Sequence, residues 1–492
     1  MNEKIDLNNL MADVDGFIKK RLVAKIKFKG VTPWWGGDHD GYTSNHIDED
    51  EIVGRVKWFL RTVYNRYCVN DLNSYKEAED KVSSYLGCTN NKSIYSFKVS
   101  NTIMRENTSY SHINRVSFLL RDKEPNVKEK FIPKDVTSFT LEIFRDRHHN
   151  KFDEIIVGAV LITLAFLGIG KGANRGFGRF IPINLDGLNT SIYSKIIQGD
   201  IRGAFKEFYD KFKRVENCTK QNSWTDSCVP LAPLINGDNA DSILETSCTS
   251  NNIVQILEII QESVLKATFK RLSYNMNVKE AGPFIHTWIY GLPRHSKVPQ
   301  NIRIKQNNME VKCDDVEVDI NDVEKNDEMG YFKLASNRKL EEPRRQSMFV
   351  ISPVLMNNGV YKIFIIPFLS LKDNEEAASL LIHKGIHINN NTIHIVGIEA
   401  MIKNNISKQL FNNELNLANK RRDLSFGDLD NLIKKYTQEL FSIINKQCKQ
   451  KTTNITTTHH SYSTNRRPIT PSQQRPSVHK TRGFNRNSKV TL

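Results

Sequence analysis

Apolar and polar positions alternate over residues 22–31, a period of two that is typical of a half-buried strand. The apolar set is Leu22, Ala24, Ile26 and Phe28, and lysines fill most of the positions between them. Over residues 51–67 the apolar side chains instead recur every three or four positions, at Ile52, Val56, Phe59, Leu60, Val63 and Tyr67. That spacing predicts an amphipathic helix. Between the two, Pro33 and the paired glycines of Thr32-Pro-Trp-Trp-Gly-Gly37 predict a turn.

The segments that follow extend this order to a whole domain. Strand-like patterns occupy residues 95–99, 116–120 and 138–144, and a helix with Asp153 as its N-cap is expected over residues 153–167. A glycine-rich segment and a strand at residues 177–183 come next. This is the βαββαβ order of a ferredoxin-like domain. We therefore expect an α+β fold whose first domain covers residues 20–190 and carries insertions.

The second half predicts a further domain over residues 253–450. Residues 215–250 show little periodicity, so we assign 191–252 to a connector or insertion. The second domain is expected to contain a helix at 253–272, a strand at 284–290 and a helix at 428–445. Its strongest signal is a hairpin, because two apolar runs, 348–355 and 360–369, flank Met356-Asn-Asn-Gly359.

The charge of the chain is uneven. Lys and Arg number 70 against 55 Asp and Glu, a net charge of +15. Residues 451–492 hold eight of these cations and no acid, and their composition predicts a disordered basic tail. Without the tail about +7 (15 − 8) remains on the folded body. The sign favours a polyanionic partner, nucleic acid before an anionic membrane, although a solvated basic surface would give the same balance.

The cysteines do not predict a metal or disulfide site. All seven are scattered, and no pair has the C-x-x-C spacing of a zinc ligand set. The N-terminus lacks the character of a signal peptide. The longest apolar run, residues 155–169, is too short to span a bilayer. We expect a soluble cytoplasmic protein that needs neither metal nor cofactor and does not bind a membrane.

The densest candidate chemistry is the glycine-rich segment. Its five glycines are Gly168, Gly170, Gly172, Gly176 and Gly178, and its cations are Lys171, Arg175 and Arg179. Glycine lets the backbone turn its N–H groups toward a ligand, and interleaved cations make a concavity suited to phosphate.

The residues on either side of this segment indicate whether it binds a nucleotide or the phosphates of RNA. Residues 168–173 fit G-x-G-x-x-A, but a helix before them and a non-helical continuation do not suit a dinucleotide site. A Walker A loop is excluded because the segment has no Gly-Lys-Ser/Thr. Two interpretations remain. The glycines could serve only a tight helix-to-strand connection, or the loop could bind successive phosphates of RNA with Phe177 stacked on a base. We favour RNA.

The polar face of the helix at residues 51–67 supplies a second signal. Gly54, Trp58, Arg61 and Asn65 align opposite the apolar stripe. A Trp next to an Arg on a polar face suits contact with RNA or a partner subunit. The alternative is that a second layer of the same chain buries Trp58.

Three motifs together resemble the RAMP superfamily of CRISPR proteins. They are the turn at residues 32–37, the helix core Lys57-Trp-Phe-Leu-Arg61 and the glycine loop at residues 168–178. In the second half, residues 286–294 and 344–347 resemble motifs of the first RAMP subunit of type III-B (Cmr) effector complexes. The similarity covers roughly residues 22–370. The chain departs from the family pattern at Lys57, usually Arg, and at Met348, usually Pro.

This resemblance implies two ferredoxin-like (RRM-like) βαββαβ domains and a non-catalytic role in antiviral defence. It implies crRNA and target RNA as ligands, near the 3′ end of the guide, and other Cmr subunits (backbone and head RAMP proteins) as partners. Guide–target pairing would supply sequence specificity. The expected RNA-binding residues are Trp34, Trp35, Arg55, Trp58, Arg61, Gly170, Lys171, Gly172, Asn174, Arg175, Gly176, Phe177, Arg179, Arg294, Arg344 and Arg345.

Two alternative functions are kept. Some RAMP proteins cut RNA, and metal-independent cleavage needs a general base near the 2′-OH. His39 and His46 are the candidates, although exposed loop histidines are commonly inert and no partner for His39 is evident. The other alternative is a general single-stranded RNA-binding protein outside CRISPR systems, acting through the same loop and tail.

Overall fold

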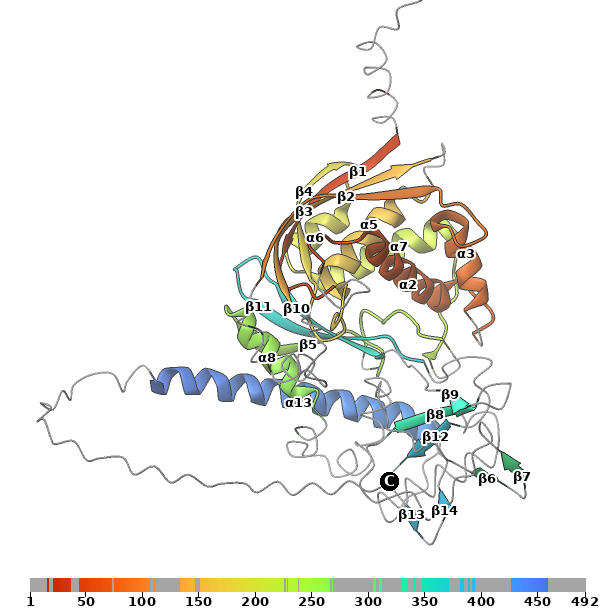
Figure 1. Cartoon of the computed structure of the whole chain (residues 1–492), viewed down its shortest axis with the longest axis vertical. Coiled ribbons are helices and arrows are strands. Elements are labelled where there is room, and N and C mark those ends of the chain that lie inside the picture. The colour runs from red at the N-terminus through yellow and green to blue at the C-terminus, as the bar shows by residue number, and fades with distance from the viewer. Residues whose placement is uncertain are drawn as a thin grey trace, which may run out of the picture. The chain divides into compact units, whose positions relative to one another are not determined.

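The computed structural model defines most of the first half of the chain and parts of the second (Figure 1). It describes residues 16, 21–36, 44–72, 75–106, 110, 113, 133–146, 151–224, 227, 229–237, 239–265, 268, 304–306, 309–311, 330–334, 340–341, 347–370, 381–384, 388–389, 392–393 and 426–458. Residues 1–450 form one compact unit and residues 451–492 a second. The strands expected at 116–120 and 284–290 lie outside the described residues.

The first sheet has the topology that its sequence order predicts. Its strands are β1 (Leu22–Gly30), β2 (Tyr95–Glu106), β3 (Lys134–Arg145) and β4 (Phe180–Gly187). They lie in the order β2-β3-β1-β4 with every neighbouring pair antiparallel. The crossovers are helix α2 (Glu49–Tyr67) and helix α5 (Asp153–Ile162), which continues as the π-helical turn η2 (Thr163–Leu167). This is the strand order and polarity of a ferredoxin-like βαββαβ unit.

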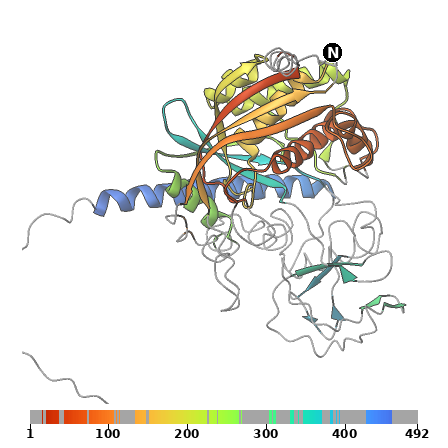
Figure 2. The same ribbon diagram turned by 45° about the horizontal axis from the view of Figure 1, so that its top comes forward.

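Strand alternation decides which face of this sheet is covered. Ala24, Ile26 and Phe28 are fully buried, whereas the lysines between them are exposed. The helices lie behind the sheet in Figure 2, and its front face carries no described helix. Asp48 caps the start of helix α2, and its carboxylate accepts a hydrogen bond of 2.8 Å from the Asp50 N–H. A side-chain acceptor at this position satisfies a backbone donor that the helix itself leaves unpaired.

Three more helices enlarge this domain. They are α3 (Lys76–Leu86), α6 (Ser191–Ile197) and α7 (Ile201–Glu216). Helix α7 packs Phe205 and Phe208 against Phe59 of α2, and Phe212 against Tyr64. The segment 191–252, expected as a connector, therefore begins with helices that complete the first core and ends with a strand of the next sheet.

The second sheet is buried on both faces. Its strands are β5 (Leu244–Ser250), β10 (Phe349–Leu355) and β11 (Tyr361–Pro367), in the antiparallel order β10-β11-β5. Val350, Val354 and Phe364 join the first core. Ile351 and Ile363 pack instead in a second core with helices α8 (Ile253–Ser263) and α13 (Phe426–Thr458). Burial on both faces explains why the hairpin reads as two continuous apolar runs.

The second sheet shares only part of the first topology. The chain order β5-α8-β10-β11-α13 and the sheet order match a βαββα unit, but no fourth strand of this sheet is among the described residues. Two complete ferredoxin-like domains are thus not confirmed, and the α+β class with antiparallel sheets is. Shorter strands form three further groups: β12 (Leu381–Lys384) with β8 (Gly330–Leu334) and β9 (Leu340–Glu341), β6 (Ile304–Gln306) with β7 (Met309–Val311), and β13 (Ile388–Asn389) with β14 (Thr392–Ile393).

The start of α5 and the end of α13 differ from the sequence prediction. Asp153 is the first residue of α5 and Phe152 is its cap. The carboxylate of Asp153 instead accepts a hydrogen bond of 2.7 Å from the Tyr95 hydroxyl and pairs with Arg145. Helix α13 continues to Thr458, so residues 451–458, expected in the disordered tail, are helical. No helix in the described part of the chain has both the length and the hydropathy needed to cross a membrane.

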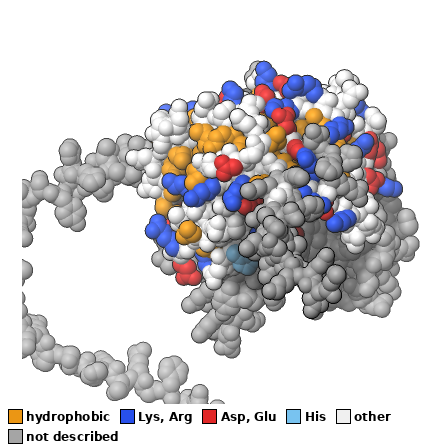
Figure 3. Space-filling model, turned by 90° about the horizontal axis from the view of Figure 1, so that it is seen from above, with side chains coloured by type: hydrophobic (Ala, Val, Ile, Leu, Met, Phe, Trp, Pro, Cys, Tyr) orange, Lys and Arg blue, Asp and Glu red, His pale blue; other side chains and the backbone are white. Residues whose placement is uncertain are grey.

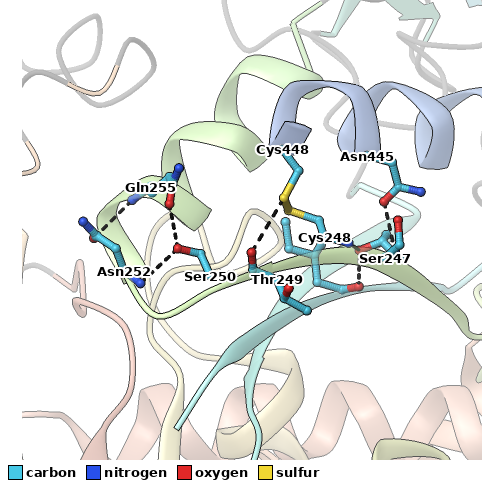
Figure 4. The surroundings of a disulfide bond; sticks show 10 residues. Ser247, Cys248, Thr249, Ser250, Asn252, Gln255, Asn445 and Cys448 are labelled. Atoms are coloured by element: carbon cyan, nitrogen blue, oxygen red, sulfur yellow. Dashed lines mark hydrogen bonds between the residues drawn. A yellow bond between two sulfur atoms is a disulfide. The ribbon is translucent and has the colours of Figure 1, made fainter. Parts of the chain in front are cut away.

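Two disulfides correct the expectation drawn from cysteine spacing. Cys68 after α2 is bonded to Cys218 after α7, and Cys248 of β5 is bonded to Cys448 of α13. Figure 4 shows the second bond, with Asn445 beside it accepting a hydrogen bond from the Ser247 N–H. The partners are 150 and 200 residues apart in sequence, so no local spacing could reveal them. Each bond lies within one of the two cores.

Candidate nucleic-acid interface

The glycine loop, residues 168–179, is held in one conformation by backbone contacts. All five of its glycines have positive φ, a region that other residues rarely adopt. A Cβ on Gly178 would lie 1.9 Å from the Ile169 carbonyl oxygen, so the loop could not close on itself with a larger residue. The Lys171 N–H donates to the Trp35 carbonyl (2.6 Å) and the Gly178 N–H to the Pro33 carbonyl (2.8 Å). Backbone hydrogen bonds therefore fix the loop to the turn at residues 32–36.

The aromatic residues predicted to contact RNA lie inside the protein. Trp34, Trp35 and Phe177 are at most 2% exposed. Trp34 donates from its indole nitrogen to Glu51 (3.0 Å), and Trp35 packs edge-on against Phe177. Stacking of Phe177 on a base does not fit this burial. We assign these three side chains to the support of the loop.

Arg179 also points inward. It is 0% exposed, and its guanidinium donates to the Phe177 and Ala173 carbonyls (both 2.8 Å) and to the Ser352 hydroxyl (3.1 Å). Burial, and then the neighbouring charge of Arg55, lowers the pKa of Arg179 well below its ordinary value. Arg179 therefore folds the loop around itself and is not presented to a ligand in this structure.

The polar face of α2 divides into a covered part and an open part. Trp58 is 8% exposed and packs on Phe368, with ring centroids 4.7 Å apart, so a second layer of the same chain covers it. Asn65 is fully buried. Arg61 pairs with Glu79 of α3, which neutralises its charge. The alternative interpretation of this face is thus confirmed for Trp58.

Arg55, beside this face of α2, differs from Arg61 because no described carboxylate pairs with it. Its guanidinium lies 4.1 Å from the centre of the Trp58 ring and donates a hydrogen bond of 2.7 Å to the Asn174 side chain. Arg55 is half-buried. Burial lowers its pKa to about 9, and no described carboxylate offsets this effect. A desolvated cation without a counter-ion favours an anionic ligand.

The parts of the loop that reach the surface adjoin Arg55. Gly170, Lys171, Gly172, Asn174 and Arg175 are half-buried, whereas Gly176 is buried. The Lys171 ammonium lies 4.9 Å from the Trp35 ring. We call Arg55, Lys171, Asn174 and Arg175 the cationic surface. Figure 3 shows one face of the molecule, where Lys and Arg side chains are spread among apolar and acidic ones rather than gathered in a single patch.

Four of the predicted residues lie outside the part of the chain that the structure describes, and His46 lies within it. Arg294, Arg344, Arg345 and His39 lie outside the described residues. His46 is exposed and bonds to the Ser44 hydroxyl (3.1 Å). Among the described residues, no group of three His, Cys, Asp or Glu side chains could hold a metal ion.

The supporting residues missed from sequence are Glu51, Gln261 and Ser352. Glu51 lies in the acidic first turn of α2, a position that favours carboxylates, so its position at the start of the helix could have been predicted from the sequence. Gln261 and Ser352 contact loop residues 86 and 173 positions away in sequence, respectively. No local pattern marks such contacts.

The first domain of the chain matches a known protein family. A profile of the RAMP superfamily matches residues 27–181. No curated protein sequence matches the chain. Among solved structures, the chain is similar to one in the type III-B Cmr-beta complex bound to cognate target RNA, with a TM-score of 0.48, 13% identity, and coverage of 85% of this chain and 100% of that one. It is also similar to apo Cmr1 from Pyrococcus furiosus, with a TM-score of 0.42, 11% identity, and coverage of 70% and 88%.

Both structural similarities are distant, and the similarity to a known family rests on the profile match. That match spans β1, the turn at residues 32–36, α2 and the glycine loop. The resemblance drawn from the sequence motifs is confirmed over this domain, because residues 27–181 match the model of the RAMP superfamily.

Proposed function

We propose that this chain is a non-catalytic, RNA-binding subunit of a type III-B CRISPR (Cmr) RNA-guided effector complex. In this proposal it contacts the 3′ region of the guide and the target RNA, and other Cmr subunits surround it. The observation that carries the proposal is the cationic surface: in a RAMP domain, Arg55 is desolvated without a carboxylate beside the loop that carries Lys171 and Arg175.

The chemistry of this surface suits a phosphate backbone. Guanidinium groups form strong, directional hydrogen bonds with phosphate oxygens. Asn174 holds the Arg55 guanidinium in place while leaving its charge unneutralised. The buried aromatic residues offer no platform for bases, so the surface would recognise backbone and shape. Guide–target pairing would then supply the sequence specificity.

The absence of catalysis is part of the proposal. RNA cleavage without a metal needs a general base and a general acid on opposite sides of the scissile phosphate. The hydrogen bonds of His46 in the described residues go to Ser44, a neighbour that supplies neither charge nor a second proton-transfer group.

RNA binding by the full-length chain tests the proposal. A labelled single-stranded RNA is titrated with the wild type and with Lys171→Ala/Arg175→Ala at several salt concentrations. We expect weaker binding and a log–log salt slope smaller by about 1–2, because two phosphate contacts are lost. Lys206→Ala, on the exposed face of α7, is the matched control. An unchanged slope in the double variant would refute the loop as a phosphate site.

Two further measurements separate the alternatives. The same RNA is incubated with the protein without metal, and intact RNA is expected; cleavage that is lost in His39→Ala or His46→Ala would identify an endoribonuclease. Purification of the chain from its native cells should recover a guide RNA and several RAMP subunits. Recovery of the chain alone with mixed RNA would instead indicate a general single-stranded RNA-binding protein.

A further inference from the structure

Residues 174 and 175 of the glycine loop contact strand β10 of the second sheet. The Ile351 N–H of β10 donates to the Asn174 carbonyl (3.0 Å), and Arg175 forms a parallel bridge with Ile351. Among the described strands, β10 lies at the edge of its sheet, where backbone groups lack a neighbouring strand. The loop therefore pairs with that edge.

Helix α8 holds the same stretch of the loop from another direction. Gln261 is 1% exposed, and its side-chain N–H donates to the Arg175 carbonyl (2.8 Å). A Cβ on Gly176 would lie 3.0 Å from Leu257 and 3.2 Å from Pro353. A side chain at residue 176 would therefore require side chains of α8 or β10 to shift, and it would sit on a backbone with φ of 94° that favours glycine.

A third contact passes through the buried Arg179. Its Nε donates to the hydroxyl of Ser352, which is 0% exposed, while its other nitrogens bind the Ala173 and Phe177 carbonyls. Ser352 thus fixes the guanidinium around which the loop is wrapped. Because Arg179 has no carboxylate partner in these contacts, its orientation depends on neutral acceptors such as this hydroxyl.

We infer that Gln261 and Ser352 are positioning residues for the RNA-binding loop, through which helix α8 and the second sheet control RNA affinity. They fix the backbone of residues 173–177, and this backbone sets where the side chains of Asn174 and Arg175 leave the loop. Binding by a loop fixed in advance avoids the entropy loss of ordering it on contact. The inference rests on the proposed function, because it assigns the control of the same surface.

The test compares two glutamines on one helix. Gln261→Met keeps the length of the side chain and removes the donor to Arg175. Gln255→Met makes the same change at a residue that instead accepts from the Ser250 hydroxyl (2.6 Å) at the start of α8, as Figure 4 shows. Ser352→Ala is the second test variant. Circular dichroism and thermal unfolding of each full-length variant establish that it is folded.

We expect Gln261→Met and Ser352→Ala to bind single-stranded RNA about tenfold more weakly with a smaller salt slope, and Gln255→Met to bind as the wild type does. In an Arg175→Ala background, Gln261→Met should weaken binding by less than about twofold, because contacts that act through one group are not additive. A purely structural role would not produce that coupling.

The outcomes separate this inference from the proposed function. Wild-type affinity and salt slope in both Gln261→Met and Ser352→Ala, with RNA binding by the wild type intact, would overturn the inference and leave the proposed function standing. Full additivity of Gln261→Met and Arg175→Ala would also overturn it. No binding of RNA by the wild type would overturn both.

Discussion

Arg55 and Asn174 are 119 residues apart in sequence, and a hydrogen bond of 2.7 Å joins the guanidinium of one to the side-chain oxygen of the other. This bond links the helix motif of the first domain to its glycine loop. The other half-buried arginine of α2, Arg61, is bound instead to Glu79. Two arginines one to two turns apart on one helix therefore differ in whether their charge is available to an anionic ligand.

Substitution of each arginine by methionine should separate these roles. Arg55→Met is expected to weaken RNA binding about tenfold, because a hydrogen bond to a charged group is lost. It should leave the free energy of unfolding unchanged or raised, since a desolvated, uncompensated charge is removed. Arg61→Met should change RNA affinity by less than about twofold, because that charge is already neutralised. Fluorescence anisotropy and urea unfolding measure both quantities, and equal losses of affinity in the two variants would contradict the assignment.

The buried pair of Arg66 and Asp241 should be the most sensitive ionic site for stability. Their side chains are 1% and 4% exposed, and Arg66 also donates to the Ala232 and Asn222 carbonyls (2.8 and 2.7 Å). These bonds hold the segment after α7 against α2. Asp241→Asn leaves the guanidinium without a counter-ion, and we expect it to lower the free energy of unfolding by about 3–5 kcal/mol.

Urea unfolding of the full-length chain measures this loss. The matched control is Asp210→Asn, which removes the exposed pair of Asp210 with Lys213 on α7 and should change stability by less than about 1 kcal/mol. Equal effects of the two substitutions would show that burial does not decide the strength of the Arg66 pair.

The two disulfides should survive purification and stabilise their own cores. Each closes a long loop, of 150 or 200 residues, and removal of either is expected to lower the free energy of unfolding by about 2–5 kcal/mol. Alkylation before reduction should label the exposed Cys88 and spare Cys68, Cys218, Cys248 and Cys448. Peptide mapping by mass spectrometry reads the result. Labelling of all of these residues before reduction would show that the bonds do not form.

Local patterns predicted the elements, and the contacts between distant segments decided the site. The alternation in β1, the spacing in α2 and the Asn-Asn-Gly turn before β11 need only neighbouring residues, so their elements were found. Helix α7 has an equally regular apolar stripe, so this helix could also have been predicted from the sequence. Trp58 is different. Its burial depends on Phe368, more than three hundred residues later, and no helical wheel contains that residue.

The same limit applies to charge. In the sequence alone, four arginines cannot be told apart as cations: Arg55, Arg61, Arg66 and Arg179. In the fold, carboxylates neutralise Arg61 and Arg66, and the glycine loop buries Arg179. Only Arg55 keeps an accessible and uncompensated guanidinium among these four. A prediction of the proposed RNA-binding site from composition therefore includes residues whose role is to hold that site together.

Glu51 should make stability depend on pH. Burial raises the pKa of its carboxyl group from 4.5 to about 7, and the hydrogen bond from the Trp34 indole lowers it only in part. The folded state thus keeps a proton that the unfolded chain releases. This contribution to stability is fully present below pH 4.5, the pKa of the unfolded chain, and is lost as pH rises toward about 7. The loss should approach about 3 kcal/mol, which is roughly the difference between the two pKa values expressed as free energy.

Glu51→Gln isolates this effect, because the amide oxygen can still accept from Trp34 but cannot ionise. The variant should match the wild type in urea unfolding near pH 4.5 and exceed it in stability near about pH 8, where the wild type holds a desolvated carboxylate. Trp34→Phe offers the opposite test: it removes the donor that favours the charged form, so the pKa of Glu51 should rise further and the loss of stability should extend to higher pH. A difference between Glu51→Gln and the wild type that stays constant over this range would mean that Glu51 is already ionised in the folded protein, and that the Trp34 contact is strong enough to offset its burial.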